Sequence, residues 1–135
     1  MPYSVLIVDD KIDVRETLQD LLIDFECSFA EAESAEEALI CLACTAFDVI
    51  FLDVKLPGIS GIEMLREARE QMPDLGPVIV LTGFPDEKTR QEATSLGAIR
   101  YLSKTPLNRE DVRRAFAAAV DHVGSEDDVA NHKGS

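Results

Sequence analysis

The chain has 135 residues, of which 46% are hydrophobic, so it is long enough to form one domain around a buried core. Its formal net charge of −13 argues against direct binding of nucleic acid, because phosphate contacts need Lys and Arg. No apolar stretch approaches the roughly 20 residues of a membrane span, and no signal-peptide pattern opens the chain. We therefore expect a cytoplasmic protein that does not enter a membrane.

Short apolar runs of the kind that form strands recur along the chain. They occupy residues 4–8, 28–32, 48–53, 77–82 and 98–103. Each run is followed by a segment with helical character, and parallel strands need such helical crossovers. The alternation predicts an α/β fold in which helices cover both faces of one parallel sheet.

The helices between these strands are indicated by their first residues and by their apolar stripes. Ser34 with Glu37, and Ser60 with Glu63, form capping boxes, and the segment near 86–96 is a polar helix with a weaker pattern. Asn108 is a suitable N-cap for the last helix, with Asp111 three positions later. The side chains expected to face the core are Val14, Leu18, Leu21, Leu22, Phe25, Ala35, Ala38, Leu39, Leu42, Ile62, Leu65, Ala68, Met72, Val112, Phe116, Ala119, Val120 and Val123.

The stretch GSEDDVANHKGS at the end has no apolar period, so we expect a folded domain over residues 1–123 and a disordered tail or linker over 124–135.

Cys41 and Cys44 form a C-x-x-C pattern late in a predicted helix, whereas redox pairs use a helix N-terminus. A zinc site would need further ligands, and His122 and His132 lie in the C-terminal part of the chain. We interpret the cysteines as small buried apolar residues, with a redox or metal site as the alternative.

Three carboxylates stand at the predicted ends of two strands. Asp9 and Asp10 follow the first strand, and Asp53 ends the third. Ligands of open α/β sheets bind outside the carboxyl ends of the strands, and like charges gathered there need a cation to remain ionised. Oxygen ligands of this kind suit Mg²⁺. The alternative is that Asp10 caps a helix, Asp9 lies in a loop and Asp53 ends a strand in solvent.

Two more strand ends carry polar groups that complete a chemical site. Thr82 closes the fourth strand, and Lys104 follows the fifth. An Asp carboxylate can act as a nucleophile and form an acyl-phosphate. Mg²⁺ and Lys104 would neutralise the phosphoryl oxygens, which is most of what phosphoryl transfer requires from a protein. The pattern therefore predicts that a phosphoryl group is held on Asp53.

The segments VDD, FLDVKLPGISG, VLTG and GAIRYLSK together resemble the response-regulator receiver domain of two-component signalling, and the chain is similar to the stand-alone chemotaxis regulator. The resemblance spans residues 4–123. It implies a doubly wound, flavodoxin-like sheet of five parallel strands in the order 2-1-3-4-5. It also implies a signalling domain rather than an enzyme, one that catalyses only its own phosphorylation and dephosphorylation.

The resemblance assigns a role to each residue of the site. Asp53 would accept the phosphoryl group from a phosphohistidine on a sensor histidine kinase or phosphotransfer protein. Asp10, Asp53 and the backbone carbonyl of Lys55 would ligate Mg²⁺, with Asp9 acting through a water molecule. Lys104 would pair with the phosphoryl group.

The resemblance also implies a switch. Thr82 would hydrogen-bond the phosphoryl group and move inward, and Tyr101 would rotate into the space that Thr82 leaves. This movement would reach the face formed by the helix near 86–96, the strand 98–103 and the last helix. On that face, Arg109, Arg113 and Arg114 are compatible with a homodimer. The alternative for Tyr101 is an ordinary half-buried aromatic residue.

The sequence departs from the family at one loop. Receiver domains usually have Pro directly after the Lys with a cis peptide between them, whereas here Thr105 separates Lys104 from Pro106. A cis bond before a non-proline residue costs about 2.5–4 kcal/mol, against roughly 0.5–1 for X-Pro. Either the Lys104–Thr105 peptide is cis, or the loop is built differently with one extra residue.

Lys55 and Phe84 lie two positions after Asp53 and Thr82, near the path by which water would reach the phosphoryl group. We expect them to slow hydrolysis, and the alternative is that both side chains point into solvent.

Two other functions compete with a phosphoacceptor: a pseudo-receiver that works only by binding, and an aspartate-nucleophile phosphohydrolase. The hydrolase would need an acid where Lys55 stands. A flavin carrier of the same topology would need a phosphate-binding Ser/Thr or Gly-rich loop after VLIVDD, where none is found.

Overall fold

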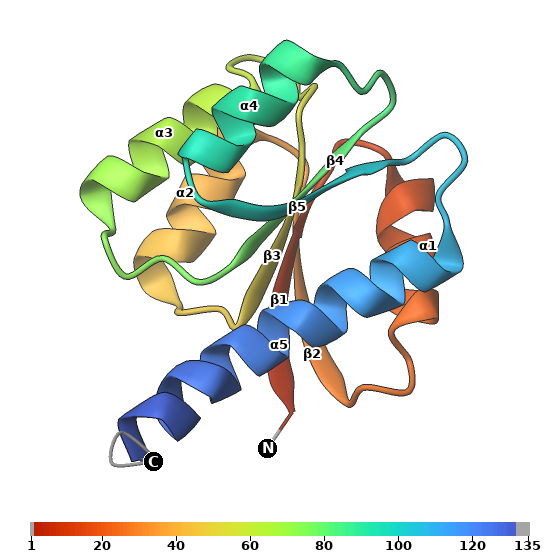
Figure 1. Cartoon of the computed structure of the whole chain (residues 1–135). Coiled ribbons are helices and arrows are strands. Elements are labelled where there is room, and N and C mark those ends of the chain that lie inside the picture. The colour runs from red at the N-terminus through yellow and green to blue at the C-terminus, as the bar shows by residue number, and fades with distance from the viewer. Residues whose placement is uncertain (1, 132–135) are drawn as a thin grey trace.

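The computed structural model describes residues 2–131, with side chains described through Asp121. Over this range the chain forms one sheet of five parallel strands in the order β2-β1-β3-β4-β5 (Figure 1). The predicted α/β fold and its strand order are confirmed. The strands are β1 (Tyr3–Val8), β2 (Cys27–Ala32), β3 (Val49–Asp53), β4 (Val78–Thr82) and β5 (Ala98–Ser103).

A helix follows every strand, as the alternating pattern predicts. The helices are α1 (Ile12–Leu21), α2 (Ala35–Cys44), α3 (Gly61–Gln71), α4 (Glu87–Ser95) and α5 (Arg109–Asn131). Figure 1 shows α2, α3 and α4 on one face of the sheet, with α1 and α5 on the other. The sheet is therefore the middle of three layers, which is the doubly wound arrangement.

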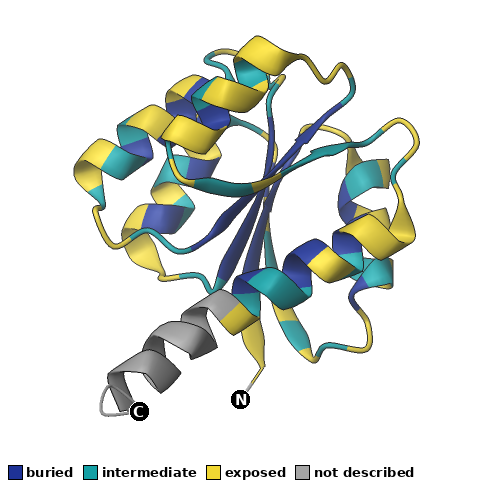
Figure 2. Ribbon diagram, in the orientation of Figure 1, coloured by how far each residue is buried: buried dark blue, intermediate teal, exposed yellow. Residues whose placement is uncertain are grey.

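The two central strands explain the uninterrupted apolar runs of the sequence. β3 and β4 are buried along their whole length (Figure 2). Side chains of a strand alternate between the two faces. Ile50 and Leu52 pack toward α2, α3 and α4, while Val49 and Phe51 pack toward α1 and α5. Because both faces are covered, each of these two strands carries only apolar side chains before its last residue.

The predicted helix starts are confirmed by side-chain caps. A backbone N–H three residues into each helix donates to a Ser or Asn side chain: Glu37 to Ser34 at 3.2 Å, Glu63 to Ser60 at 3.1 Å and Asp111 to Asn108 at 3.0 Å. The polar helix α4 begins in the same way, with the Asp86 carboxylate accepting from the Thr89 N–H at 2.8 Å. Each cap satisfies a backbone donor that the helix leaves open.

Most of the predicted core residues lie in the two apolar layers, and Met64 on α3 is an addition to them. The side chain of Val123 lies outside the described side chains. The last helix is bounded at Asn131, beyond residue 123, where we ended the folded domain. Residues 132–135 of the expected tail lie outside the described residues, so that domain division stays a prediction. Within the described residues, no helix combines the length and the apolar character of a membrane span.

The interpretation of the cysteines is partly wrong. Cys44 is exposed and Cys41 is half-buried, so the pair does not consist of small buried residues. Both lie near the end of α2, as expected, far from the helix N-terminus that would activate a thiol. Burial, with a smaller contribution from the charge of Asp48, raises the pKa of Cys27 to about 11. The side chain of His122 and the whole of His132 lie outside what the structure describes.

Candidate functional site

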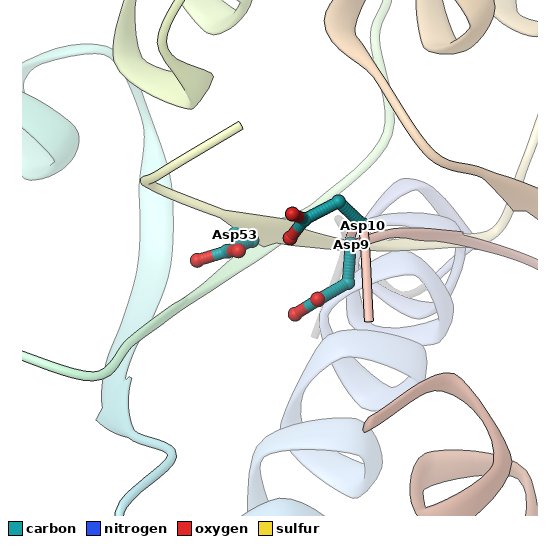
Figure 3. Close-up of side chains that lie close together, drawn as sticks. All are labelled: Asp9, Asp10 and Asp53. Carbon is teal, nitrogen blue, oxygen red and sulfur yellow. The ribbon is translucent and has the colours of Figure 1, made fainter. Parts of the chain in front are cut away.

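The three predicted carboxylates lie together at the carboxyl ends of neighbouring strands (Figure 3). β1 pairs with β3 so that Val8 lies beside Leu52, which brings the residues after Val8 next to Asp53. One ligand atom from each of Asp9, Asp10 and Asp53 lies within 4.8 Å of the others. Asp9 and Asp53 are 1% and 2% exposed, whereas Asp10 is exposed to solvent. The alternative is wrong for two of the three residues: Lys11 rather than Asp10 is the N-cap of α1, and Asp53 is buried, whereas Asp9 does lie in the loop after β1.

Lys104 lies between the two buried carboxylates. Its Nζ is 2.8 Å from Asp9 Oδ2 and 2.9 Å from Asp53 Oδ2, and its side chain is 10% exposed. Burial raises the pKa of Asp53, the hydrogen bond from Lys104 lowers it, and the charge of Asp9 raises it again, so that the net shift is upward. Burial lowers the pKa of Lys104, but its contacts with Asp53 and Asp9 outweigh this effect and raise it overall. The lysine therefore stays charged beside them.

The arrangement has the composition of a site for a divalent cation. Three carboxylates face one ammonium group, so the cluster carries an excess of negative charge. The donors are all oxygens, and Asp10 and Asp53 both line an open pocket of about 490 Å³. Hard cations such as Mg²⁺ prefer oxygen ligands and keep several water molecules, which an open pocket allows. The residues present therefore fit Mg²⁺.

The hydroxyl groups of Thr82 and Tyr101 both accept hydrogen bonds from the loop between β4 and α4. Thr82 is 4% exposed, and its hydroxyl accepts a hydrogen bond from the Phe84 N–H at 3.1 Å. Tyr101 is half-buried on β5, and its hydroxyl accepts from the Asp86 N–H at 3.4 Å. Thr82 follows Leu81, which pairs with Asp53, so its hydroxyl belongs to the same edge of the sheet.

Lys55 and Phe84, which both line the pocket near Asp53, contact one another. The Lys55 Nζ lies 5.2 Å from the centre of the Phe84 ring, and Phe84 is 74% exposed. Both residues line the same pocket as Asp10, Asp53 and Lys104. Their contact is a cation–π interaction between two exposed side chains, so an effect on hydrolysis stays a prediction.

The loop after Lys104 differs from the family pattern, and its cis peptide lies one position further along the chain. The cis peptide is Thr105–Pro106, so the alternative of a cis Lys104–Thr105 bond is wrong. The Lys104 N–H donates to the Thr82 carbonyl at 2.8 Å, which continues the β4–β5 ladder by one residue. The extra residue therefore falls after Lys104 and leaves the lysine in line with the strand.

The structure places two further residues close to the site that the sequence pattern does not reveal. Arg15 is 7% exposed, and its guanidinium donates to the Asp9 carbonyl. A Cβ on Gly61 would lie 2.0 Å from the Asp53 carbonyl oxygen, so only glycine lets α3 begin so close to the end of β3. The sequence does offer a signal for each residue. Arg15 is a basic residue on the same helical stripe as Leu18, and Gly61 directly follows the capping serine.

The arginines of α5 divide between two surroundings. Arg113 donates from Nη1 to the Leu21 carbonyl at 2.9 Å and lies 3.3 Å from the Asp24 carboxylate. It therefore faces α1, and its expected place on an exposed dimer face is wrong. Arg109 and Arg114 are exposed.

Comparisons with known proteins agree with this fold. The model of the response regulator receiver domain family matches residues 5–117. The chain is 32% identical over 124 residues to the transcriptional regulatory protein ZraR of Escherichia coli (strain K12), covering 92% of this chain and 28% of that protein. It is 34% identical over 114 residues to the transcriptional regulatory protein ResD of Bacillus subtilis (strain 168), covering 84% and 47%. The chain spans less than half the length of these relatives.

Solved structures give the same result. A CheY-like receiver domain protein from Methanospirillum hungatei JF-1 superimposes with a TM-score of 0.85 at 25% identity, covering 93% of this chain and 99% of that one. The chemotaxis protein CheY4 of Vibrio cholerae superimposes with a TM-score of 0.78 at 30% identity, covering 88% and 99%. The fold, the carboxylate cluster and the matched residues lead to one conclusion: the chain belongs to the response regulator receiver domain family of two-component systems.

Proposed function

We propose that this receiver domain accepts a phosphoryl group on Asp53 in the presence of Mg²⁺ and passes the signal to an output partner or domain. The donor is a phosphohistidine on a sensor histidine kinase or phosphotransfer protein. The observation that carries the proposal is the cluster of Asp9, Asp10 and Asp53, with Lys104 2.9 Å from the Asp53 carboxylate. The names of ZraR and ResD support an output in transcriptional control, and a cytoplasmic location follows from such a role.

The chemistry is an in-line transfer between the histidine and Asp53. A carboxylate oxygen of Asp53 forms a bond to phosphorus, while the phosphorus–nitrogen bond breaks and its electron pair returns to the imidazole, which takes up a proton. Asp10, Asp53 and the Lys55 carbonyl would hold Mg²⁺, with Asp9 acting through water. The cation supplies positive charge to the phosphoryl oxygens. Lys104 gives up its contact with the Asp53 oxygen and pairs with the phosphoryl group.

The switch follows from the contacts of the β4–α4 loop. To bind a phosphoryl group on Asp53, the Thr82 hydroxyl turns inward and stretches or breaks its contact with the Phe84 N–H. The loop that carries Phe84 continues to Asp86, whose N–H donates to the Tyr101 hydroxyl. A shift of this loop therefore reaches Tyr101, and through it the α4-β5-α5 face. A homodimer through that face stays a prediction.

The contact between Lys55 and Phe84 serves to slow the loss of the phosphoryl group. Both side chains line the pocket that also contains Asp53, and we expect them to hinder the water molecule that attacks phosphorus. An exposed cation–π pair contributes about 0.5–1 kcal/mol, which corresponds to a roughly two- to fivefold change in rate. Phe84→Ala and Lys55→Asn should each speed dephosphorylation by about this factor, as measured from the decay of purified phosphoprotein. Unchanged decay in both variants would mean that the pair does not cover the phosphoryl group.

The proposal is tested by intact mass after incubation with a small phosphodonor and Mg²⁺. We expect one added phosphoryl group on the wild type, and none on Asp53→Asn or in the absence of Mg²⁺. No addition to the wild type would favour a pseudo-receiver that works by binding. Multiple turnovers of the donor, with no lasting adduct, would favour a phosphohydrolase. That outcome is not expected, because Lys55 stands where such an enzyme needs its general acid.

A further inference from the structure

Arg15 is a buried cation on α1, in line with the apolar residues Leu18 and Leu22. Arginine is almost never buried without partners, so its contacts show what it does. Its Nε donates to Glu31 Oε1 on β2 at 2.7 Å, and its Nη1 donates to the Asp9 carbonyl at 2.7 Å. One guanidinium group therefore ties α1, β2 and the segment after β1 together.

Asp9 is held from every side. Its N–H donates to the Ala32 carbonyl at 3.0 Å, and its two carboxylate oxygens accept from the Lys11 N–H and from Lys104, both at 2.8 Å. The contact from Arg15 adds the carbonyl group to this set. The side chain and the N–H of Asp9 are already held by these contacts. The guanidinium of Arg15 constrains the polar group that is left, the backbone carbonyl of Asp9.

The direction of this carbonyl sets the orientation of the peptide group from which Asp10 extends. The carbonyl of Asp9 and the N–H of Asp10 belong to one planar peptide group, so they turn together. Asp10 is exposed, and solvent does not constrain its carboxylate. The position of Asp10 relative to Asp53 therefore depends on how firmly the preceding peptide group is held.

We infer that Arg15, anchored by Glu31, is a positioning residue that aims Asp10 at a divalent cation shared with Asp53. This inference rests on the proposed function, because it concerns the same cation. Residues that orient metal ligands typically change metal affinity by about 10–100-fold when they are removed. Arg15 does this without touching the cation, through a backbone carbonyl.

A purely electrostatic role makes the opposite prediction. A positive charge near a cation site repels the cation, so neutralising Arg15 would tighten binding and leave Glu31 as an additional negative charge nearby. A positioning role means that the same substitution weakens binding. The sign of the change therefore separates the two roles. Arg15→Lys separates them again, because it keeps the charge but cannot reproduce two directed guanidinium bonds.

The experiment measures Mn²⁺ binding to the whole chain by electron paramagnetic resonance, with Mg²⁺ as competitor and without any phosphodonor. We expect Arg15→Gln to weaken Mn²⁺ binding by about 10–100-fold, and Arg15→Lys to weaken it as well. Equal or tighter binding in Arg15→Gln would overturn the inference. Should Arg15→Gln fail to fold, wild-type affinity in Arg15→Lys would overturn it instead. Thermal unfolding of each variant shows that binding is measured on folded protein.

Arg113→Gln is the matched control. Like Arg15, Arg113 donates to a backbone carbonyl and pairs with a carboxylate, but it does so at the far end of α1. We expect this variant to lose stability and to bind Mn²⁺ as the wild type does. Asp10→Asn separates the inference from the proposed function. If the wild type binds no better than Asp10→Asn, the proposed cation site itself is wrong, whereas normal loss in Asp10→Asn with no loss in Arg15→Gln contradicts only the role of Arg15.

Discussion

The two edges of the sheet each hold a partly buried cation, and the two cations have different partners. At the carboxyl edge, Lys104 lies between the carboxylates of Asp9 and Asp53. At the amino edge, Arg69 donates to three backbone carbonyls at 2.7, 3.1 and 3.2 Å; these belong to Leu96, Leu75 and Gly97. Arg69 also lines a groove of about 1060 Å³ formed mainly by the segments that precede β3, β4 and β5.

The partners differ in charge, which separates an edge with excess negative charge from an edge held by backbone carbonyls. The carbonyls around Arg69 are neutral and belong to the backbone, so this cation clamps the end of α4 to the loop after α3. The partners of Lys104 are charged side chains, and they exceed it in charge. Close packing does not distinguish the edges, because each has a glycine pressed against a carbonyl oxygen: Gly61 on Asp53 and Gly76 on Phe47. Unbalanced charge does.

The largest expected effect is at Lys104. Lys104→Met leaves Asp9 and Asp53 buried without their cation, and breaking such a pair costs about 3–5 kcal/mol. We expect the free energy of unfolding, measured in urea without divalent cations, to fall by this order. Added Mg²⁺ should restore part of the loss. A loss below about 1 kcal/mol would show that the carboxylates are hydrated or protonated, and that the edge is not held together by charge.

The two glycines offer a direct comparison between the edges. A Cβ would lie 2.0 Å from the Asp53 carbonyl oxygen in Gly61→Ala, and 2.6 Å from the Phe47 carbonyl oxygen in Gly76→Ala. Overpacking costs about 1–3 kcal/mol and more where backbone must move. We therefore expect both variants to lose stability, with Gly61→Ala losing more. Only Gly61→Ala should also reduce the phosphorylated fraction seen by intact mass, because the displaced strand end carries Asp53.

Arg69→Met removes the donor of three carbonyls at the amino edge. Hydrogen bonds to a charged group contribute about 1.5–3 kcal/mol each when buried, but this side chain is partly exposed and water replaces some of them. We expect a loss of about 2 kcal/mol in urea unfolding, with an unchanged rate of phosphorylation. A slower rate with normal Mn²⁺ binding would contradict the separation of the two edges.

The sequence is sufficient to predict the strands and most of the polar residues at the carboxyl edge. The site is predictable because Asp9 and Asp53 both follow apolar runs at strand ends, and Lys104 and Thr82 lie at equivalent strand ends. The sequence does not predict the contacts of Arg15, because only the pairing of β2 with β1 brings its partner Glu31 near. Pairings between side chains of different elements leave little trace in the linear pattern.

Other errors have the same origin. The sequence places Arg113 on an exposed face, whereas the structure turns it toward Asp24 in the loop after α1. The sequence predicts a buried Cys44, but this residue is the last of α2 and is exposed. In both cases the residue type was compatible with two environments, and the three-dimensional position of a helix end decided between them.

The smallest expected effect is a dependence of stability on pH that belongs to the carboxyl edge. Burial is the largest cause that raises the pKa of Asp53 above its ordinary value of 3.8. Between 3.8 and the raised value, the folded protein holds a proton on Asp53 that the unfolded chain has released. The free energy of unfolding therefore falls as pH rises through this window.

The contribution of Asp53 is isolated by comparing the wild type with Asp53→Asn, since other carboxylates titrate in the same range. Without divalent cations, we expect the wild type to lose stability relative to the variant as pH rises above 3.8. Mg²⁺ should flatten or reverse this trend, because a bound cation favours the ionised carboxylate. Arg69→Met should follow the wild-type profile at a lower level. A constant difference between wild type and Asp53→Asn would mean that Lys104 fully offsets the burial of Asp53, leaving the two edges electrostatically alike.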